Sequence, residues 1–197
     1  MSFWTNKKVL VTGGAGFIGS HLIKNIISEG CEITVIDNLE RGDSSRLPKN
    51  VKFYKLDLKT DSCSFLFKEK DIVIHLASKV GGIGFYKEKP YDIMSEMLLI
   101  DSNTIKAVVE NNVKILFYAS SAHVYPIELQ LNTNPLPLCE KDTNVFNPAL
   151  SYGESKLITE KVLTRLKQQS NIKIAIARYC GIYGEGLDYS LNSSVIP

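Results

Sequence analysis

Short apolar runs alternate along this chain with longer stretches in which apolar residues recur at helical spacing. The first run covers residues 9–11 and stops at a cluster of glycines, and a helical pattern from Ile18 to Ile27 follows it. Further runs predict buried strands over residues 32–37, 51–56, 71–76, 113–118 and 172–177. The run at 9–11, the glycines and the helical pattern after them predict that the chain begins as strand, turn and helix.

Two long helices are predicted in the second half of the chain. One covers residues 90–111 and starts at Pro90, and the other covers residues 151–169. Between them, residues 126–148 are rich in Pro, Asn and Leu without clear periodicity, which predicts a long loop. The alternation of strands and helices, without an internal repeat, predicts an α/β fold of the Rossmann type: a doubly wound parallel sheet with right-handed crossovers.

Composition is that of an ordinary globular protein. The chain has 197 residues, 44% of them hydrophobic and 22% charged, which suggests a single domain over residues 1–197. Its 23 basic and 21 acidic side chains are scattered, without the basic stripe that follows a nucleic-acid backbone. No apolar run approaches the roughly 18 residues of a membrane span. We therefore expect a cytoplasmic protein that binds neither nucleic acid nor a membrane.

The cysteines Cys31, Cys63, Cys139 and Cys180 lie far apart in the sequence. They form no C-x-x-C pair and have no histidine cluster nearby, which argues against a metal site and against a disulfide framework. We expect them to be buried free thiols.

The segment TGGAGFIGSH, which starts at Thr12, joins the first predicted strand to the first predicted helix. Gly14, Gly16 and Gly19 form the pattern G-x-G-x-x-G, and Gly13 adds a second, overlapping register. Glycines at these positions permit a tight turn and let the backbone approach a pyrophosphate. The placement between strand and helix favours dinucleotide binding over the alternative, a glycine-rich turn with no ligand.

Asp37 ends the second predicted strand, where a carboxylate can accept both hydroxyls of a ribose. A 2′-phosphate beside this carboxylate would be repelled, so we predict NAD as the cofactor. Arg41 follows four residues later and could neutralise such a phosphate, which leaves NADP open.

Tyr152 and Lys156 are four residues apart on a predicted helix and therefore share one of its faces. A free phenol has a pKa near 10, and a shift of about 3 units would make it a useful base at neutral pH. A neighbouring ammonium favours the charged phenolate. Downstream of a pyrophosphate turn, this pair indicates hydride chemistry on a nicotinamide. The alternative is a solvated helix face.

With these segments in place, the chain resembles the extended short-chain dehydrogenase/reductase family, the NAD-dependent epimerases and dehydratases that act on nucleotide sugars. The resemblance is carried by TGGAGFIGSHL, DNLERG from Asp37, HLASKVGG from His75, YASSAHVYP from Tyr118, YGESK from Tyr152 and RYCGIYG from Arg178. Within the family, SKVGGIGF and residues 90–103 look most like GDP-fucose synthase and GDP-mannose 3,5-epimerase. A GDP-linked sugar is the substrate that this branch implies.

The resemblance implies roles for two residues after the fifth predicted strand. Ser121 would donate a hydrogen bond to the sugar oxygen as it changes between alcohol and carbonyl. His123 stands where related dehydratases carry an acidic residue and the two GDP-sugar enzymes carry a cysteine. An imidazole there could move a proton at the neighbouring carbon. The alternative for His123 is a polar loop residue that bonds backbone.

The resemblance also implies cofactor contacts. Asp57 and Leu58 would hold the adenine, and Ala77, Ser78 and Lys79 would line the path of the nicotinamide ribose and the phosphates. The alternative for these positions is a strand end closed by small residues. The full implied set of cofactor contacts is Gly13, Gly16, Phe17, Ile18, Gly19, Asp37, Asn38, Asp57, Leu58, Leu76, Ala77, Ser78, Lys79, Ala119, Tyr152, Lys156 and Tyr179.

The chain departs from the family pattern at several places. Gly181 replaces an asparagine near the substrate phosphates, Glu185 stands where proline is usual, and Met97 replaces an asparagine of the long helix. Ser194 or Val195 falls where the GDP-sugar enzymes place a second basic acid/base residue. Substrate recognition at the phosphates and a two-base epimerisation are both weakened by these departures.

The function indicated is an NAD-dependent nucleotide-sugar epimerase or reductase that acts by transient hydride transfer at a sugar carbon. A dehydratase and a non-catalytic NAD-binding module, or a fragment of a longer epimerase, are the alternatives. The resemblance implies a substrate-binding subdomain that is largely missing from residues 1–197. It also implies a homodimer through the two long helices.

Overall fold

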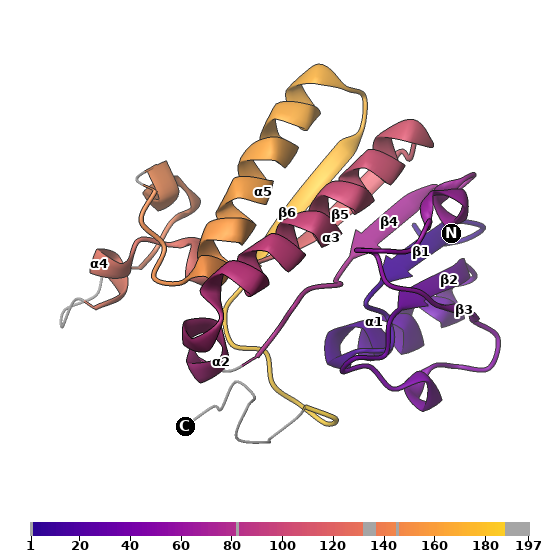
Figure 1. Ribbon diagram of the computed structural model, residues 1–197. Coiled ribbons are helices and arrows are strands. Elements are labelled where there is room, and N and C mark those ends of the chain that lie inside the picture. Colours follow the sequence, from indigo (N-terminus) through magenta and orange to yellow (C-terminus); the bar gives the residue numbers. More distant parts are fainter. Residues whose placement is uncertain (1, 82, 132–136, 145, 188–197) are drawn as a thin grey trace. The chain divides into compact units, whose positions relative to one another are not determined.

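The computed structural model describes residues 2–81, 83–131, 137–144 and 146–187 (Figure 1). Its six strands form one sheet in the order β3-β2-β1-β4-β5-β6. In chain order they are β1 (Lys8–Thr12), β2 (Glu32–Asp37), β3 (Lys52–Lys55), β4 (Ile72–His75), β5 (Ile115–Ser121) and β6 (Lys173–Tyr179). The pairings β1–β2, β1–β4, β2–β3 and β4–β5 are all parallel. The strand order runs outward from β1 in both directions, and the predicted Rossmann-type fold is confirmed.

The helices are α1 (Phe17–Ile26), α2 (Ile83–Glu88), α3 (Pro90–Glu110), α4 (Ile127–Gln130) and α5 (Ser151–Gln169). The predictions of α1, α3 and α5 are confirmed, and α3 starts at Pro90 as expected. The long loop predicted over residues 126–148 contains two short helical segments, α4 and a 3₁₀ turn at Glu140–Asn144, while its residues 132–136 and 145 lie outside the described residues. Helices of one turn are too short to show periodicity in a sequence.

The chain forms two compact units. Unit 1 comprises Met1–Ser78, Leu99–Tyr118 and Leu166–Ala175, and unit 2 comprises Lys79–Leu98, Ala119–Arg165 and Ile176–Pro197. The glycine turn belongs to unit 1, whereas Tyr152 and Lys156 belong to unit 2.

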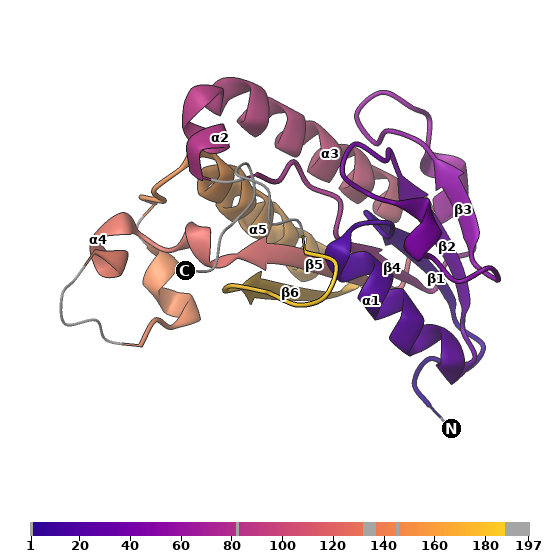
Figure 2. The same cartoon turned by 90° about the horizontal axis from the view of Figure 1, so that it is seen from below.

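The core of unit 1 lies on both faces of its strands. One face carries the buried alternate residues of β1, β2 and β4 together with two residues of α1; the cluster is Val9, Val11, Ile23, Ile26, Ile33, Val35, Ile72 and Ile74. The opposite face carries Leu10, Ile36 and Val73, which are equally buried. Figure 2 shows α1 on one side of these strands and the later half of α3 on the other. Burial on both faces explains why the central strand reads as an unbroken apolar run.

Unit 2 is built around the first half of α5. On one side, Tyr152 and Leu150 pack against the buried residues Tyr86, Ile93 and Met97. On the other side, Leu157 packs against Val124 and Tyr125. The first two turns of the helix that carries the predicted catalytic pair are therefore held by apolar contacts on two sides.

The expectation for the cysteines holds only in part. All four thiols are free, but only Cys63 is buried; Cys31 is half-buried, and Cys139 and Cys180 are exposed. The last two lie outside the helices and strands, where backbone runs near solvent. Among the described residues, no group of His, Cys, Asp and Glu could hold a metal ion. Within the same residues, no helix is long and apolar enough to cross a membrane.

Candidate active site

The glycine turn of unit 1 leaves no room for a side chain at Gly13 and Gly19, where the nearest atoms are backbone. Gly13 has φ +68°, and a Cβ there would lie 2.7 Å from the backbone nitrogen of Ala77. A Cβ on Gly19 would lie 2.5 Å from the carbonyl oxygen of Gly13. These two glycines therefore let the turn close against β4 and against the first turn of α1.

Gly16 has a different environment. It caps α1 without a side-chain hydrogen bond, and a Cβ there would meet only the Gly13 carbonyl oxygen, at 3.3 Å. The first turn of α1 begins with Phe17 and Ile18 and contains no acidic residue. An open backbone at a helix N-terminus is the arrangement that receives phosphate groups, so the turn fits a pyrophosphate.

Asp37 ties the end of β2 to the glycine turn. One carboxylate oxygen accepts the backbone N–H of Ala15 at 3.0 Å, and the other accepts that of Leu39 at 2.9 Å. Burial raises the pKa of Asp37, and the backbone donors oppose this effect. Each carboxylate oxygen can accept further hydrogen bonds, so the group can hold the turn and still receive ribose hydroxyls.

Asn38 and Asp57, both predicted to contact the cofactor, lie together. The Asn38 amide donates to Asp57 Oδ2 at 3.2 Å, while Asp57 Oδ1 accepts the backbone N–H of Lys59 at 2.8 Å. Leu58 is buried, and its carbonyl oxygen accepts the Asn103 amide at 2.8 Å. The residues predicted for the adenine therefore form one fixed corner of unit 1.

The end of β4 faces the glycine turn through backbone and hydroxyl contacts. The backbone N–H of Leu76 donates to the Thr12 carbonyl at 3.1 Å, and that of Ala77 donates to Thr12 Oγ1 at 3.3 Å. Ser78 Oγ is buried and has no hydrogen-bond partner among the described residues. A buried hydroxyl without a partner is uncommon, and it is the kind of group that a bound ligand would satisfy.

Four buried polar side chains of unit 1 form a continuous hydrogen-bonded chain, which the sequence did not predict. Thr12 Oγ1 and His75 Nδ1 are 2.6 Å apart, and His75 Nε2 lies 3.0 Å from Asp101 Oδ1. The Tyr118 hydroxyl donates to Asp101 Oδ2 at 2.6 Å. All four side chains are at most 2% exposed, so the chain joins β1, β4, β5 and α3 inside unit 1.

In unit 2, the structure brings the predicted catalytic residues together. The Tyr152 ring packs on Tyr86 of α2 with ring centroids 4.8 Å apart, and meets the His123 ring edge to face at 5.8 Å. Lys156, one turn along α5 and 2% exposed, donates from Nζ to the carbonyl oxygen of Ala119 at 2.9 Å. The predicted helix face is therefore turned inward, and the alternative of a solvated face is wrong.

Ser121 and His123 are linked by a short turn after β5. The backbone N–H of His123 donates to Ser121 Oγ at 3.2 Å, which leaves the hydroxyl proton of Ser121 to be donated elsewhere. Burial lowers the pKa of His123, so its imidazole is neutral at pH 7. Gly153 packs against the His123 carbonyl so closely that a Cβ would collide with it. This glycine therefore sets the distance between α5 and the turn.

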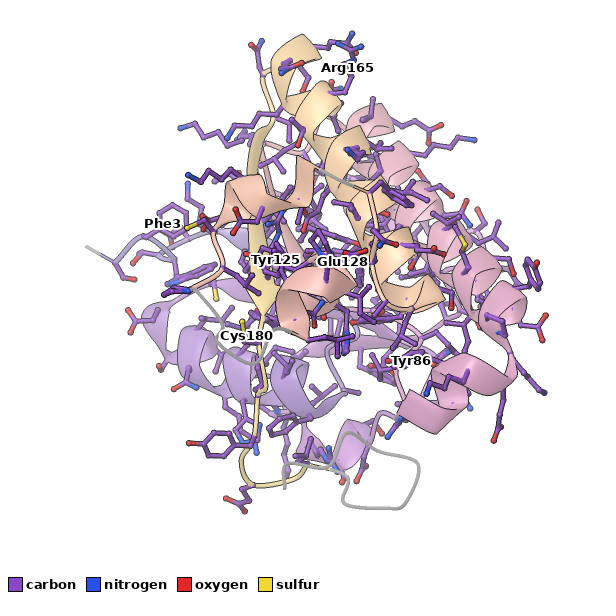
Figure 3. The ribbon with its side chains drawn as sticks, turned by 90° about the vertical axis from the view of Figure 1, so that its left-hand side faces the viewer. Phe3, Tyr86, Tyr125, Glu128, Arg165 and Cys180 are labelled. Atoms are coloured by element: carbon purple, nitrogen blue, oxygen red, sulfur yellow. The ribbon has the colours of Figure 1, made fainter. Side chains whose placement is uncertain are left out.

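Arg178 and Glu160 form a buried ion pair that the sequence did not reveal. Arg178 Nη2 lies 2.6 Å from Glu160 Oε2, and its Nε donates to Oε1 at 3.0 Å. The guanidinium also stacks over the Tyr125 ring, 4.9 Å from its centroid; Figure 3 labels Tyr125 in unit 2. Ser120 Oγ donates to Glu160 Oε1 at 2.5 Å. These residues lie on β5, α5 and β6, and only folding brings them together.

Other predicted positions are resolved as follows. Lys79 forms an ion pair with Glu96 of α3, 3.5 Å away, and Tyr179 is half-buried at the end of β6. Burial raises the pKa of Tyr179.

The positions that depart from the family pattern have several environments. Met97 is buried and accepts the Ser155 hydroxyl at 3.3 Å, so the residue that replaces an asparagine is part of the core. Gly181 has open space around its Cβ position, and Glu185 is exposed. Ser194 and Val195 lie outside the described residues.

Comparison with known proteins identifies the family to which the chain belongs. The model of the NAD dependent epimerase/dehydratase family matches residues 9–197. The chain belongs to this family. The predicted resemblance is thereby confirmed, and NAD is the cofactor that the family's description names.

Relatives include enzymes of GDP-linked and UDP-linked sugars. The chain is 34% identical over 185 residues to GDP-mannose 3,5-epimerase 1 of Oryza sativa subsp. indica, covering 92% of this chain and 49% of the relative. It is 32% identical over 199 residues to UDP-glucose 4-epimerase of Lactobacillus helveticus, covering 96% of this chain and 56% of the relative. The chain thus spans about half the length of these relatives.

Solved structures show the same fold. A UDP-N-acetylglucosamine 4-epimerase from Methanobrevibacter ruminantium, solved with UDP-N-acetylmuramic acid, superposes with a TM-score of 0.85 at 30% identity, covering 97% of this chain and 60% of that one. A UDP-glucose 4-epimerase of Thermus thermophilus, solved with NAD, gives a TM-score of 0.75 at 30% identity, covering 87% of this chain and 54% of that one.

Proposed function

We propose that this chain is the NAD-binding and catalytic part of a nucleotide-sugar epimerase. The observation that carries the proposal is the grouping in unit 2, where His123 meets the Tyr152 ring while Lys156 shares the inward face of α5. These groups can transfer protons at a sugar hydroxyl and at a neighbouring carbon, and they occur in a chain of an NAD-dependent family.

The cofactor would be held by unit 1 through the open backbone at Gly16, the carboxylate of Asp37 and the corner formed by Asn38 and Asp57. When bound, NAD supplies the acceptor and donor of a hydride. The buried carboxylate of Asp37 favours NAD over NADP, because a 2′-phosphate beside it would be repelled. The unpartnered hydroxyl of Ser78 would gain a partner on cofactor binding.

The side chains of unit 2 would move the protons. Tyr152 would take the proton of the sugar hydroxyl, and the Lys156 ammonium would stabilise the resulting phenolate electrostatically. Ser121 would donate a hydrogen bond from its hydroxyl to the same sugar oxygen. Its own oxygen already accepts the His123 N–H, so the hydroxyl hydrogen is available for this bond. The neutral imidazole of His123 would accept a proton from the neighbouring carbon.

The role of His123 bears on the type of epimerisation. Inversion by hydride removal and return at one carbon needs no exchange of carbon-bound hydrogen with solvent. Inversion at a carbon next to a transient ketone does need it, and a neutral base beside Tyr152 is suited to that step. We therefore favour a GDP-linked sugar and chemistry of the kind that the name of the rice relative describes. A homodimer stays a prediction.

Deuterium incorporation would test this proposal. The protein is incubated in D₂O with NAD and either GDP-mannose or UDP-glucose, and the sugar is examined by NMR. We expect deuterium at a carbon of the GDP-linked sugar, and none when His123 is replaced by Asn. Epimerised UDP-glucose without deuterium would contradict the preference for carbon-acid chemistry. NAD binding without turnover of either sugar would favour a binding module.

A further inference from the structure

Glu160, which forms an ion pair with Arg178 of β6, lies on the same face of α5 as the proposed catalytic pair. Tyr152, Lys156 and Glu160 are spaced four residues apart on α5, so they follow one another along one side of the helix. Lys156 bonds the carbonyl oxygen of Ala119, and Glu160 accepts the hydroxyl of the next residue, Ser120. The ammonium and the carboxylate therefore reach neighbouring points of β5.

An unpaired carboxylate at Glu160 would be a strong competitor for the ammonium. Both side chains are buried, Lys156 at 2% and Glu160 at 6% exposure, where charges interact more strongly than in water. A phenolate at Tyr152 depends on that ammonium, so a second anion one turn beyond Lys156 would oppose its formation.

Arg178 removes this competition. Its Nε and Nη2 atoms engage both carboxylate oxygens of Glu160, and Ser120 adds a further donor to Oε1. The remaining guanidinium donors bond the Glu140 carbonyl oxygen at 3.0 Å and Thr143 Oγ1 at 2.9 Å, which fixes the fork in place. The bonds to Glu160 raise the pKa of Arg178, so the guanidinium stays charged.

We infer that Arg178 and Glu160 are positioning residues that cancel each other's charge, so that the Lys156 ammonium remains the net charge acting on Tyr152. This inference rests on the roles proposed above for Tyr152 and Lys156. Two ionisable groups of unit 2 contact the Tyr152 ring: His123, whose pKa burial lowers, and the phenol of Tyr86. The pair at 160 and 178 is a charge source that substitution can alter without touching the Tyr152 ring.

The test is a titration of Tyr152 in four proteins: the unchanged chain, Glu160→Gln, Arg178→Gln and the double variant. Tyrosines are labelled with ¹³C at Cζ, and the Tyr152 signal is assigned by its loss in Tyr152→Phe. Tyr152 and Glu160 are eight residues apart on α5, which is about 12 Å along the helix axis. At that separation and an effective dielectric constant of about 20, one unbalanced charge moves the titration midpoint of Tyr152 by roughly one pH unit.

We expect shifts of opposite sign. Glu160→Gln leaves Arg178 unbalanced and lowers the midpoint by about one unit, whereas Arg178→Gln leaves Glu160 unbalanced and raises it by about one unit. The double variant returns to within a few tenths of the unchanged protein. Lys161→Gln, on an exposed position of the same helix, is the matched control and leaves the midpoint unchanged.

Equal midpoints in the unchanged protein and Glu160→Gln would overturn the inference, as would shifts of the same sign in both single variants. Glu160→Gln keeps an acceptor for Ser120 and Arg178, so it decides the matter even if Arg178→Gln fails to fold. A purely structural pair would lower the melting temperature and leave the midpoint in place. Because the readout is independent of turnover, failure of the proposed function would appear separately, as an active Tyr152→Phe variant.

Discussion

Gly16 and Gly19 are three residues apart, yet the structure predicts different consequences for the same added methyl group. At Gly19 the methyl would lie 2.5 Å from the Gly13 carbonyl oxygen and 2.6 Å from Gly14 Cα. Both neighbours are backbone, so the turn itself would have to move. At Gly16 the methyl would meet only the Gly13 carbonyl oxygen, at 3.3 Å.

Gly19→Ala is therefore expected to destabilise the fold. Overpacking against backbone costs about 1–3 kcal/mol, which lowers the melting temperature of a protein of this size by roughly 5 °C. Gly16 has φ −73° and ψ 179°, which alanine adopts freely, so Gly16→Ala should change the melting temperature by no more than about 2 °C. Its methyl would instead occupy the space that a pyrophosphate needs, weakening NAD binding about tenfold or more.

Calorimetric titration with NAD and thermal unfolding followed by circular dichroism would measure the two effects. Gly84→Ala is the matched control, because nothing lies within 4 Å of that Cβ position and α2 tolerates alanine. Wild-type NAD affinity in Gly16→Ala would refute the assignment of this turn to the pyrophosphate. A wild-type melting temperature in Gly19→Ala would refute the packing argument.

Three further substitutions test the site. Tyr152→Phe should abolish deuterium exchange and leave the NAD dissociation constant within about twofold, since only the hydroxyl is lost; persistent exchange would contradict the role of the phenol. Asp37→Ser should raise the affinity for NADP relative to NAD, measured by titration, because the repelling carboxylate is gone; an unchanged ratio would argue against ribose binding there. Burial lowers the pKa of His123, so the unfolded chain binds the extra proton first. Its contribution to stability is present above the unfolded pKa of about 6.5 and is lost as pH falls through that value toward the folded pKa. His123→Gln should therefore flatten the decline in melting temperature between pH 7.5 and pH 5, and an unchanged decline would show that the imidazole is solvated.

The strands and long helices were predictable because burial leaves a period in the sequence. Glu32–Asp37 and Ser151–Gln169 agree with the expected bounds at both ends, since a turn signal or a change of period lies on each side. By contrast, α2 and α4 are only one or two turns long. Neither could be seen as a period; α2 packs through Tyr86 within unit 2, whereas α4 buries none of its residues.

In the candidate site, too, the local sequence patterns were predictable and the contacts between distant residues were not. Glycine spacing and the Tyr152–Lys156 pair are local patterns, so both could be named from the sequence. The pair Arg178–Glu160 spans 18 positions, and Ser120–Glu160 spans 40. No local pattern links residues at such separations. The same reason hid the packing of Tyr86 on Tyr152, which arises from α2 and α5 meeting in the fold.

The buried chain from Thr12 to Tyr118 implies a fixed direction of proton donation. A carboxylate at Asp101 only accepts hydrogen bonds, so His75 donates to it from Nε2, as the Tyr118 hydroxyl does. An imidazole with its one proton on Nε2 accepts at Nδ1, so the Thr12 hydroxyl donates to His75 while its oxygen accepts the Ala77 N–H. Every donor of this hydrogen-bonded chain thus points toward one carboxylate. Replacing that carboxylate by an amide would place an NH₂ donor opposite His75 or Tyr118, so the hydrogen bond there would have to reverse its direction. The hydrogen-exchange rate of the backbone N–H of Ala77, which bonds Thr12 at the far end of this chain, would report such a reversal.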